Sequence, residues 1–256
     1  MNRHMNDEEE VFFPNGRGRT LKGVFHHPAS GKSLSAAILC HGMESNKESD
    51  KIVALSRALA EKGILALRFD FSYARESSGK FEDITYSGEV EDLRAAYDFV
   101  LRLPVEKIGI LGSSMGGTVA LLFAAQEKRI AALAAIAAPL HPDRITETLL
   151  SKEEVERWRR EGFLFYHGRR INISLLKDLE NIDVPKAVKQ ISCPVLIVHG
   201  DQDETVAVAE AQELYAHIEA PKRLAILRGA DHRLTRPAHL QRALDESRDW
   251  LVHHLR

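Results

Sequence analysis

Several features that would assign the chain to a special class of protein are scarce or missing in its 256 residues. There are two cysteines, Cys40 at the end of one apolar run and Cys193 at the start of another, which predicts two core thiols at opposite ends of a sheet and no disulfide. No run reaches the roughly 18 apolar residues of a membrane-spanning helix. The first ten residues lack the apolar core of a signal peptide, so a cytoplasmic protein is expected.

An excess of charge of one sign is also missing. The chain has 35 Lys and Arg against 37 Asp and Glu, a formal net charge of −2, and the two signs are well mixed. Such a surface makes no strong field, so neither a nucleic-acid partner nor a membrane partner is expected. Hydrophobic residues make up 44% of the chain, which is enough for one full core. Residues 1–256 are therefore predicted to form a single domain.

The sequence does contain a regular alternation of short apolar runs and amphipathic helical patterns. After a hairpin pattern around the Gly16 to Gly18 turn, almost continuous apolar runs of this kind are typical of parallel strands buried on both faces. The expected strands cover 36–40, 63–69, 107–111, 130–138, 194–198 and 223–227. Strict alternation with helices predicts right-handed crossovers and a mostly parallel, doubly wound sheet of the α/β class.

The alternation is interrupted once, over about residues 140–190. Roughly fifty residues are too many for an ordinary connection between a helix and a strand, so we expect an inserted helical cap over the strand ends. Four aromatic residues give this insertion a face that could line an acyl or phenolic pocket, and a small helical core packed on the sheet is the alternative. These residues are Trp158, Phe163, Phe165 and Tyr166.

A glycine-rich turn between a predicted strand and a predicted helix carries the pattern G-x-S-x-G, from Gly112 to Gly116. In this context the serine is held in strained backbone geometry with its hydroxyl projecting, and glycines two residues to either side avoid collisions with backbone. The register selects Ser114 over Ser113, because no glycine lies two residues before Ser113. We therefore predict that Ser114 is a nucleophile; an ordinary glycine-rich turn is the alternative.

A serine hydroxyl becomes an effective nucleophile when a histidine accepts its proton and an acid orients that histidine. In a sheet of this type the acid and then the histidine follow the serine, each in a loop after a later strand. Among the later histidines His232 alone directly follows a predicted strand, so it is the expected base, with a surface histidine as the alternative. The loop after 194–198 holds three acids, and spacing alone does not choose among Asp201, Asp203 and Glu204.

Attack on an acyl carbonyl creates a negative oxygen that two backbone N–H groups must meet. Met115, which follows the serine, is expected to supply one of them. The loop after strand 36–40 is expected to supply the other, because Gly42 lets the chain turn so that Met43 can point its amide inward. A metal site among the histidines and acids of the later loops is the competing interpretation. No familiar ligand spacing supports it, so neither a metal nor a cofactor is expected.

Four short motifs occur in chain order, each at a predicted strand end: HGM at 41–43, GSSMGG at 112–117, HGDQDETV at 199–206 and GADH at 229–232. Together they resemble the α/β-hydrolase family over about residues 36–255. Within it the chain looks most like small bacterial carboxylesterases of the cinnamoyl and feruloyl esterase type. The resemblance implies an α/β-hydrolase fold with a short cap, and it implies Asp203 as the acid.

One departure from the resembling proteins concerns the loop after residues 68–71. Relatives commonly have an Arg-Gly-His-Gly-like turn there, whereas this chain has SYARESSGKFED. The shape of the entrance is therefore not carried over from the family, and no substrate contact is assigned to this loop.

The predicted activity is a serine hydrolase that cleaves carboxylic esters through an acyl-serine intermediate, with aryl or cinnamoyl-type esters as one substrate class. Ser114 would attack, His232 would move the proton and Asp203 would orient the imidazole. The amides of Met43 and Met115 would hold the oxyanion. The triad determines acyl chemistry but neither the leaving group nor the acceptor, so a lipase, peptidase or acyltransferase stays an alternative, as does a non-catalytic binding protein. The expected partner is a small-molecule ester, and a homodimer stays open.

Overall fold

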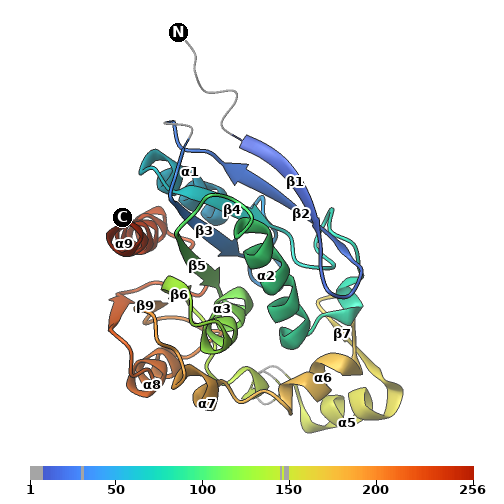
Figure 1. Ribbon diagram of the computed structural model, residues 1–256. Helices are drawn as coiled ribbons and strands as arrows, with labels where there is room; N and C mark the ends of the chain where they lie inside the picture. The colour runs from blue at the N-terminus through green and yellow to red at the C-terminus, as the bar shows by residue number, and fades with distance from the viewer. Residues whose placement is uncertain (1–7, 30–31, 145, 147–149) are drawn as a thin grey trace.

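The computed structural model describes residues 8–29, 32–144, 146 and 150–256. Residues 1–7 of the leader, and residues 145 and 147–149 of the expected cap, lie outside the described residues. An eight-stranded sheet runs through the molecule in the order β1-β2-β4-β3-β5-β6-β9-β10. Helices cover both of its faces (Figure 1).

The sheet is antiparallel at one edge and parallel elsewhere. Its strands are β1 (Glu8–Pro14), β2 (Thr20–His26), β3 (Ser35–Cys40), β4 (Leu65–Phe69), β5 (Lys107–Ser113), β6 (Ile130–Ile136), β9 (Val195–Gly200) and β10 (Lys222–Leu227). Strand β2 pairs antiparallel with β1 and β4, and all the pairs from β4 to β10 are parallel. The predicted N-terminal hairpin and the mostly parallel, doubly wound sheet are confirmed.

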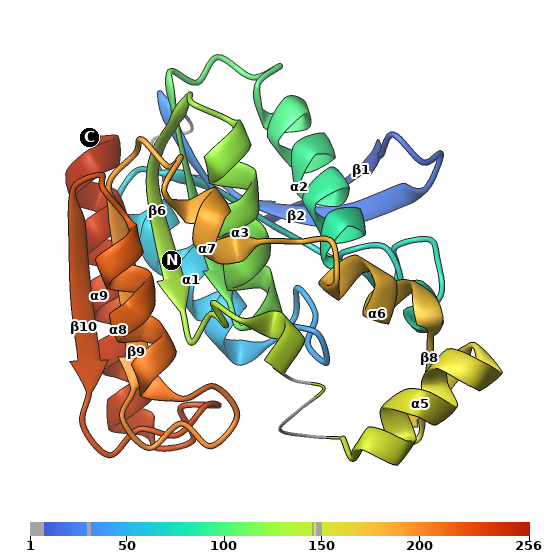
Figure 2. The same ribbon diagram turned by 90° about the horizontal axis from the view of Figure 1, so that it is seen from below.

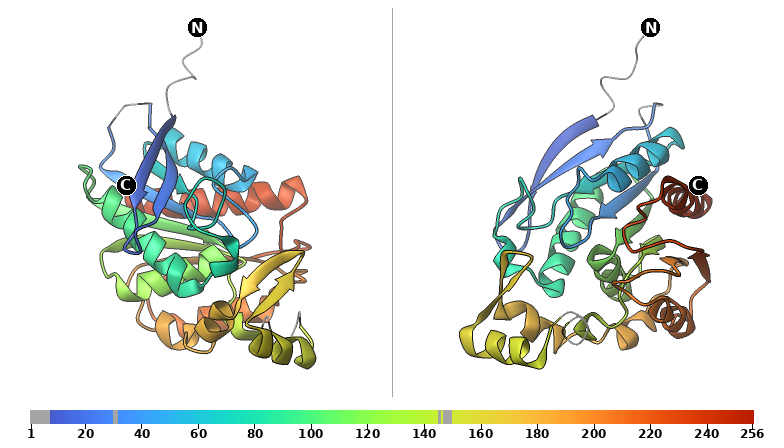
Figure 3. Two further views of the ribbon diagram at one scale, coloured as in Figure 1. Left: turned by 90° about the vertical axis from the view of Figure 1, so that its right-hand side faces the viewer. Right: turned by 180° about the vertical axis from the view of Figure 1, so that it is seen from behind.

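The helices divide between the two faces of the sheet. Helices α1 (Asp50–Glu61) and α9 (Pro237–Leu255) contribute to the core on one face. The other face is covered by α2 (Tyr86–Val100), α3 (Met115–Gln126), α7 (Val184–Val188) and α8 (Val208–His217). Figure 3 shows α1 and α9 next to each other when the molecule is seen from behind.

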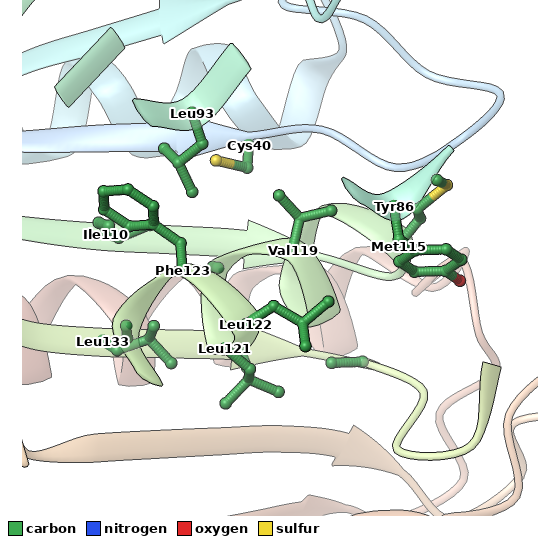
Figure 4. Packing of buried hydrophobic residues seen from close by; sticks show 14 of the residues in the cluster. Cys40, Tyr86, Leu93, Ile110, Met115, Val119, Leu121, Leu122, Phe123 and Leu133 are labelled. Atoms are coloured by element: carbon green, nitrogen blue, oxygen red, sulfur yellow. The ribbon is translucent and has the colours of Figure 1, made fainter. Parts of the chain in front are cut away.

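Alternation along the strands explains why two separate cores form. On β3, Ile38 and Cys40 belong to the core under α2 and α3, whereas Ala37 and Leu39 belong to the core under α1 and α9. Successive strand residues point to opposite faces, so an uninterrupted apolar run fills both. Figure 4 shows Cys40 beside Leu93 of α2 on the first of these faces. Cys40 and Cys193 are both buried and free, as expected.

The C-terminal helix α9 extends to Leu255 and includes His253 and His254. Leu251 and Leu255 are buried, and their side chains pack near Gly109 on β5. Packing against the sheet therefore stabilises the last turns of the helix. In the described part of the chain no helix is long and apolar enough to cross a membrane.

The insertion over 140–190 is a mixed α and β unit and not a purely helical one. It contains the short turn η2 (Pro142–Arg144), helix α5 (Lys152–Glu161), strands β7 (Phe163–Tyr166) and β8 (Arg169–Asn172), helix α6 (Ile173–Leu179) and α7. Gly162 ends α5 with a φ of 79°, and the aromatic segment that follows pairs with β8 as an antiparallel hairpin. Aromatic residues favour a strand over a helix. Figure 2 shows α5, β8 and α6 at one end of the molecule, beside the sheet.

A further short turn, η1 (Phe81–Asp83), lies in the loop between β4 and α2 that departs from the resembling family. Asn172 at the end of β8 donates a hydrogen bond to Asp83 at 2.9 Å, and the Arg169 guanidinium stacks 3.4 Å from the Phe81 ring centroid. The loop therefore packs against the inserted hairpin and supports it.

Candidate active site

The turn from β5 into α3 holds Ser114 in a conformation that L-amino acids rarely adopt. Its φ is 54° and its ψ is −126°, and its backbone N–H donates to the carbonyl of Ile136 at 2.8 Å. A non-glycine residue with positive φ stores strain, and such strain concentrates at functional sites. Ser114 is half-buried.

The two flanking glycines are required by close backbone contacts. A Cβ atom on Gly112 would lie 2.1 Å from the carbonyl oxygen of Gly116. A Cβ atom on Gly116 would lie 2.3 Å from the carbonyl oxygen of His41, at the end of the neighbouring strand. The spacing of the motif therefore reflects how tightly the turn is packed between β5, α3 and β3.

His232 lies over this serine, in the loop between β10 and α9. Its Nε2 is 3.1 Å from Ser114 Oγ, and its Nδ1 is 2.8 Å from Asp203 Oδ2. A carboxylate can only accept, so Nδ1 carries the proton and Nε2 is left to accept the serine proton. Gly229, with a φ of 74°, makes the turn that returns the chain toward the sheet. The structure thus brings together the three side chains predicted as a triad.

The side chain of Asp203 is fully buried, with 0% exposed, and it is surrounded by hydrogen-bond donors. Oδ1 accepts from the backbone N–H groups of Thr205 and Val206 at 2.9 and 2.7 Å, while His199 Nε2 lies 3.2 Å from Oδ2. Burial raises the pKa of Asp203, but the hydrogen bonds from His199, His232 and Val206 outweigh it and lower the pKa. The carboxylate is therefore ionised and oriented at neutral pH.

The other two acids of this loop have different partners. Asp201 Oδ1 accepts from the backbone N–H of Gly229 at 2.6 Å, which ties the acid loop to the loop of His232. Glu204 is exposed, and its Oε2 lies 3.3 Å from the backbone nitrogen of His232. Only Asp203 contacts the imidazole among the three candidates that spacing left open.

The loop after β3 packs directly against the nucleophile. A Cβ atom on Gly42 would lie 3.2 Å from Ser114 Cβ, so glycine permits the close approach. His41 fixes this loop: its Nδ1 lies 2.8 Å from the carbonyl of Gly42, and its Nε2 accepts from the backbone N–H of Phe71 at 3.2 Å. Burial lowers the pKa of His41, so the ring is a neutral, structural clamp. Met43 follows Gly42 in the loop, and Met115 opens α3, where the first N–H groups have no partner within the helix.

An apolar pocket opens beside these two methionines. Met43, Tyr86 and Met115 line one part of it, residues of the insertion line the rest, and the lining surface is almost entirely apolar. Its lining consists of Met43, Tyr86, Met115, Pro142, Leu150, Trp158, Leu164, Tyr166, Ile171, Leu175 and Leu179. Figure 4 shows Tyr86 and Met115 next to each other at the end of the α3 core. The pocket therefore continues from the serine turn to the insertion.

Comparison with known proteins identifies the family. The model of the alpha/beta hydrolase domain matches residues 34–190, more than half of the chain. The chain belongs to the α/β-hydrolase family. The resemblance inferred from the four motifs is confirmed, and the protein is a hydrolase.

Two solved structures and one curated relative are similar to this hydrolase over most of its length. Est1E from Butyrivibrio proteoclasticus, solved with bound ferulic acid, superposes with a TM-score of 0.86 at 26% identity, covering 95% of this chain and 98% of Est1E. An esterase domain of a Rhodothermus marinus protein gives a TM-score of 0.75 at 25% identity, with 97% and 99% covered. A mitochondrial palmitoyl-protein thioesterase of Mus musculus, ABHD10, is 27% identical over 79% of this chain and 70% of its own length.

Only two of the four aromatic residues that we expected in the pocket line it. Trp158 and Tyr166 line it, whereas Phe163 and Phe165 do not, and Phe165 is 64% exposed. The expectation treated the segment as one aromatic face. Because the segment forms strand β7, neighbouring side chains point to opposite faces, so Leu164 and Tyr166 face the pocket while Phe163 and Phe165 face away from it. The rings of Phe163 and Phe165 contact each other edge to face, with 5.7 Å between their centroids.

Sequence reasoning also missed most of the pocket wall. Tyr86, the first residue of α2, had no signal beyond an ordinary helix start, and the loop before it carries no family motif. Ile171 enters the pocket because it pairs with Leu164 across the hairpin. Leu175 and Leu179 lie one turn apart on α6, a pattern that a helical core would share. Nothing local distinguishes a pocket wall from a core.

The competing metal interpretation finds no support in the described residues, where no group of three or more His, Cys, Asp or Glu side chains is arranged to hold a metal ion. His199 turns its Nε2 to the carbonyl of Val206 at 2.9 Å, and Asp231 Oδ1 accepts from the backbone N–H of Thr235 at 2.9 Å. His199 Nε2 and the Asp231 carboxylate therefore form hydrogen bonds within their own loops.

Proposed function

We propose that this hydrolase cleaves carboxylic esters by a serine mechanism, with Ser114, His232 and Asp203 as its catalytic triad. The observation that carries the proposal is the continuous hydrogen-bonded chain from Ser114 Oγ through the imidazole to Asp203 Oδ2, with distances of 3.1 and 2.8 Å. A nucleophile, a base and an orienting acid in this geometry activate the serine hydroxyl. The esterase relatives favour an ester as the acyl donor.

In the first half-reaction, Ser114 Oγ forms a bond to the carbonyl carbon while its proton passes to His232 Nε2. The imidazolium is stabilised by the Asp203 carboxylate, which is already ionised and buried beside it. The carbonyl oxygen becomes an oxyanion, for which the backbone N–H groups of Met43 and Met115 are the proposed donors. Collapse of this intermediate breaks the bond to the alcohol oxygen, and His232 donates the proton to the departing alcohol.

In the second half-reaction, a water molecule gives its proton to His232 and attacks the acyl-serine. Collapse of the second tetrahedral intermediate releases the carboxylic acid, and the proton returns to Ser114.

The proposal is tested with a short p-nitrophenyl ester and a serine-directed phosphonate. We expect turnover and labelling of a single peptide that contains Ser114, and we expect both to be lost in Ser114→Ala. Ser87→Ala is the matched control, because Ser87 is an exposed serine on α2 and should leave both unchanged. Turnover that persists in Ser114→Ala, or a label elsewhere, would contradict the proposal.

The apolar pocket favours an aryl or cinnamoyl-type group on the substrate. Trp158 is 2% exposed and lines the pocket, and Phe165 offers a matched aromatic residue of the same insertion that lies outside it. We expect Trp158→Ala to lower kcat/KM for a cinnamate ester by roughly tenfold or more, and Phe165→Ala to leave it unchanged. Equal effects of the two variants, or no preference for cinnamate over acetate in the unmodified enzyme, would reject this substrate class.

A thioester is the second candidate substrate, because the thioesterase of Mus musculus is similar over most of this chain. The same serine attack would expel a thiolate in place of an alcohol. Comparing kcat/KM for a matched ester and thioester with the same acyl group decides between them. A preference for the thioester in the unmodified enzyme would assign the protein to the second class.

A further inference from the structure

The tip of the inserted hairpin reaches back to the loop after β3. Strands β7 and β8 are joined by the two-residue turn of His167 and Gly168. His167 Nδ1 lies 3.2 and 3.3 Å from the two carboxylate oxygens of Glu44. A carboxylate can only accept, so Nδ1 is the donor of this contact. Glu44 directly follows Met43, and the contact therefore joins the insertion to the loop that carries one proposed oxyanion donor.

Histidine is not the residue that this turn favours. His167 has a φ of 47° and Gly168 a φ of 75°, and a two-residue hairpin turn with two positive φ values favours Asn-Gly, Asp-Gly or Gly-Gly. The histidine ring stacks on Tyr166, with 4.1 Å between the ring centroids and an interplanar angle of 21°, while its Nδ1 contacts Glu44. The turn alone therefore does not account for a histidine at the tip, whereas these two contacts do.

Glu44 also faces the loop between β10 and α9. Its Oε2 lies 4.0 Å from the guanidinium of Arg233, which directly follows His232 in the chain. The insertion and two loops of the active site therefore meet at one carboxylate. Glu44 and His167 each adjoin a residue that lines the apolar pocket, since Met43 precedes the first and Tyr166 precedes the second. The meeting point thus lies at the rim of that pocket.

The two charges at the rim act on a wall of the pocket. Burial raises the pKa of Tyr166, the Glu44 carboxylate adds to this rise, and the Arg233 guanidinium opposes it. The Glu44 side chain is 33% exposed and that of Arg233 is 75% exposed, so solvent weakens their attraction. Contacts of this kind contribute little to the stability of a fold. Their effect is therefore expected on the segment that they hold.

The other strand of the hairpin is attached elsewhere. Asn172 donates to Asp83 at 2.9 Å and Arg169 stacks on Phe81, which fixes β8 to the loop that contains η1. Strand β7, which carries the pocket wall, ends at Tyr166, immediately before the tip. The contact between the tip and Glu44 therefore holds the end of the strand that faces the pocket.

We propose that Glu44 is a specificity-determining residue of this hydrolase, which clasps the tip of the insertion at His167 and so keeps the apolar pocket in the form that receives a large acyl group. The inference rests on the proposed function. A pocket that already has its binding form takes up a ligand with a smaller loss of conformational freedom. A cinnamoyl group places a phenyl ring against the insertion, whereas an acetyl group has nothing to place there. Release of the tip therefore penalises the cinnamoyl ester more than the acetyl ester.

The test measures the ratio of kcat/KM for p-nitrophenyl cinnamate to that for p-nitrophenyl acetate. Glu44→Ala and His167→Gly each break the contact, and glycine suits the tip turn. We expect each to lower the ratio by roughly two- to fivefold, the size of one partly exposed pair, mainly through a higher KM for the cinnamate. The double variant should lose no more than either single variant, because both break the same contact.

Two further variants serve as rescue and control. His167→Asn keeps a donor nitrogen at the same distance along the side chain, so its ratio should stay closer to that of the unmodified enzyme than the ratio of His167→Gly. Glu9→Ala breaks a matched pair of glutamate and histidine on the edge of the sheet, where Glu9 Oε2 lies 2.8 Å from His27 Nε2. It should leave the ratio unchanged.

The inference is overturned if Glu44→Ala or His167→Gly leaves the ratio unchanged or raises it, if their effects add in the double variant, or if His167→Asn loses as much as His167→Gly. A merely structural pair would lower kcat/KM for both esters equally and so leave the ratio unchanged.

A second readout does not need turnover. Calorimetry measures the dissociation constant of methyl cinnamate from Ser114→Ala, with and without Glu44→Ala, and we expect the added substitution to raise it by the same two- to fivefold. Equal constants, or no binding to either protein, would also overturn the inference. If no ester is turned over and Ser114 is not labelled, the proposed function fails, while this titration still decides whether Glu44 shapes the pocket.

Discussion

Two buried carboxylates lie at the ends of parallel strands in this hydrolase, and only one of them lies within hydrogen-bond distance of a histidine. Asp70 follows β4 and Asp203 follows β9, and both side chains are 0% exposed. Each also has a histidine nearby: His41 Nε2 lies 4.0 Å from Asp70, and His232 Nδ1 lies 2.8 Å from Asp203. By residue type and position in the sheet the two sites are alike.

They differ in how the negative charge is balanced. Asp70 accepts from the backbone N–H and the Nζ of Lys47 at 2.7 and 2.8 Å, so a permanent cation satisfies it, while His41 is occupied by other partners. Asp203 accepts only from N–H donors, and the cation that it can stabilise is the imidazolium of His232. A carboxylate already neutralised by lysine stabilises the fold, whereas one that faces a titrating histidine can support proton transfer.

Removing the charge of Asp203 should have the largest effect. Asp203→Asn can no longer stabilise the imidazolium or hold the correct tautomer, so we expect kcat for an ester to fall by about 10⁴-fold. The measurement is steady-state kinetics normalised by phosphonate titration of Ser114. Asp70→Asn is the matched control, and its kcat should stay within about tenfold of the unmodified enzyme. A similar loss in both variants would mean that the distinction between the two carboxylates is wrong.

The reverse experiment breaks the Asp70 site. Lys47→Met leaves Asp70 as an uncompensated buried charge, so we expect the free energy of unfolding to fall by about 3–5 kcal/mol. Asp70→Asn should cost less, because Lys47 keeps its ion pair with Glu76 at 2.7 Å. Urea unfolding followed by circular dichroism measures both. If Asp70→Asn proves the more destabilising variant, Lys47 is not the partner that makes burial of Asp70 tolerable.

Acid titration sharpens the same comparison. The pKa of Asp203 is lowered in the folded state, so its contribution to stability is present above the unfolded value of about 3.9 and is lost as pH falls toward the folded value. The difference in unfolding free energy between the unmodified enzyme and Asp203→Asn should therefore shrink steadily between about pH 5 and pH 2. A difference that is independent of pH over this interval would show that Asp203 is not held ionised by its donors.

The smallest effect is expected at the neighbouring acid. Glu204 is exposed and reaches only the backbone nitrogen of His232, at 3.3 Å. Glu204→Gln should change kcat/KM by less than about fivefold, the size expected for one weak hydrogen bond. A loss comparable to that of Asp203→Asn would transfer the role of the orienting acid to Glu204.

Much of the fold could be predicted because its signals are local. Apolar runs of strand length predicted the parallel strands, and the glycines around Ser114 predicted the strained turn that the backbone contacts of Gly112 and Gly116 now explain. The insertion was harder to predict, since FLFY is compatible with a helix or a strand until its partner is known. Pairing of Leu164 with Ile171 makes the segment a strand, and Phe163 and Phe165 then lie on the face that points away from the pocket.

The sequence by itself determined the fold class, the strained turn and the identity of the nucleophile candidate, because periodicity and turn geometry act between residues a few positions apart. Spacing did not choose among the three acids, and the family resemblance only implied Asp203. The tertiary structure decided that Asp203 contacts His232, and it decided which aromatic side chains face the pocket. These outcomes depend on the sheet order β3-β5-β6-β9-β10, which brings loops separated by more than a hundred residues to one end of the sheet. No spacing within a single loop records that convergence.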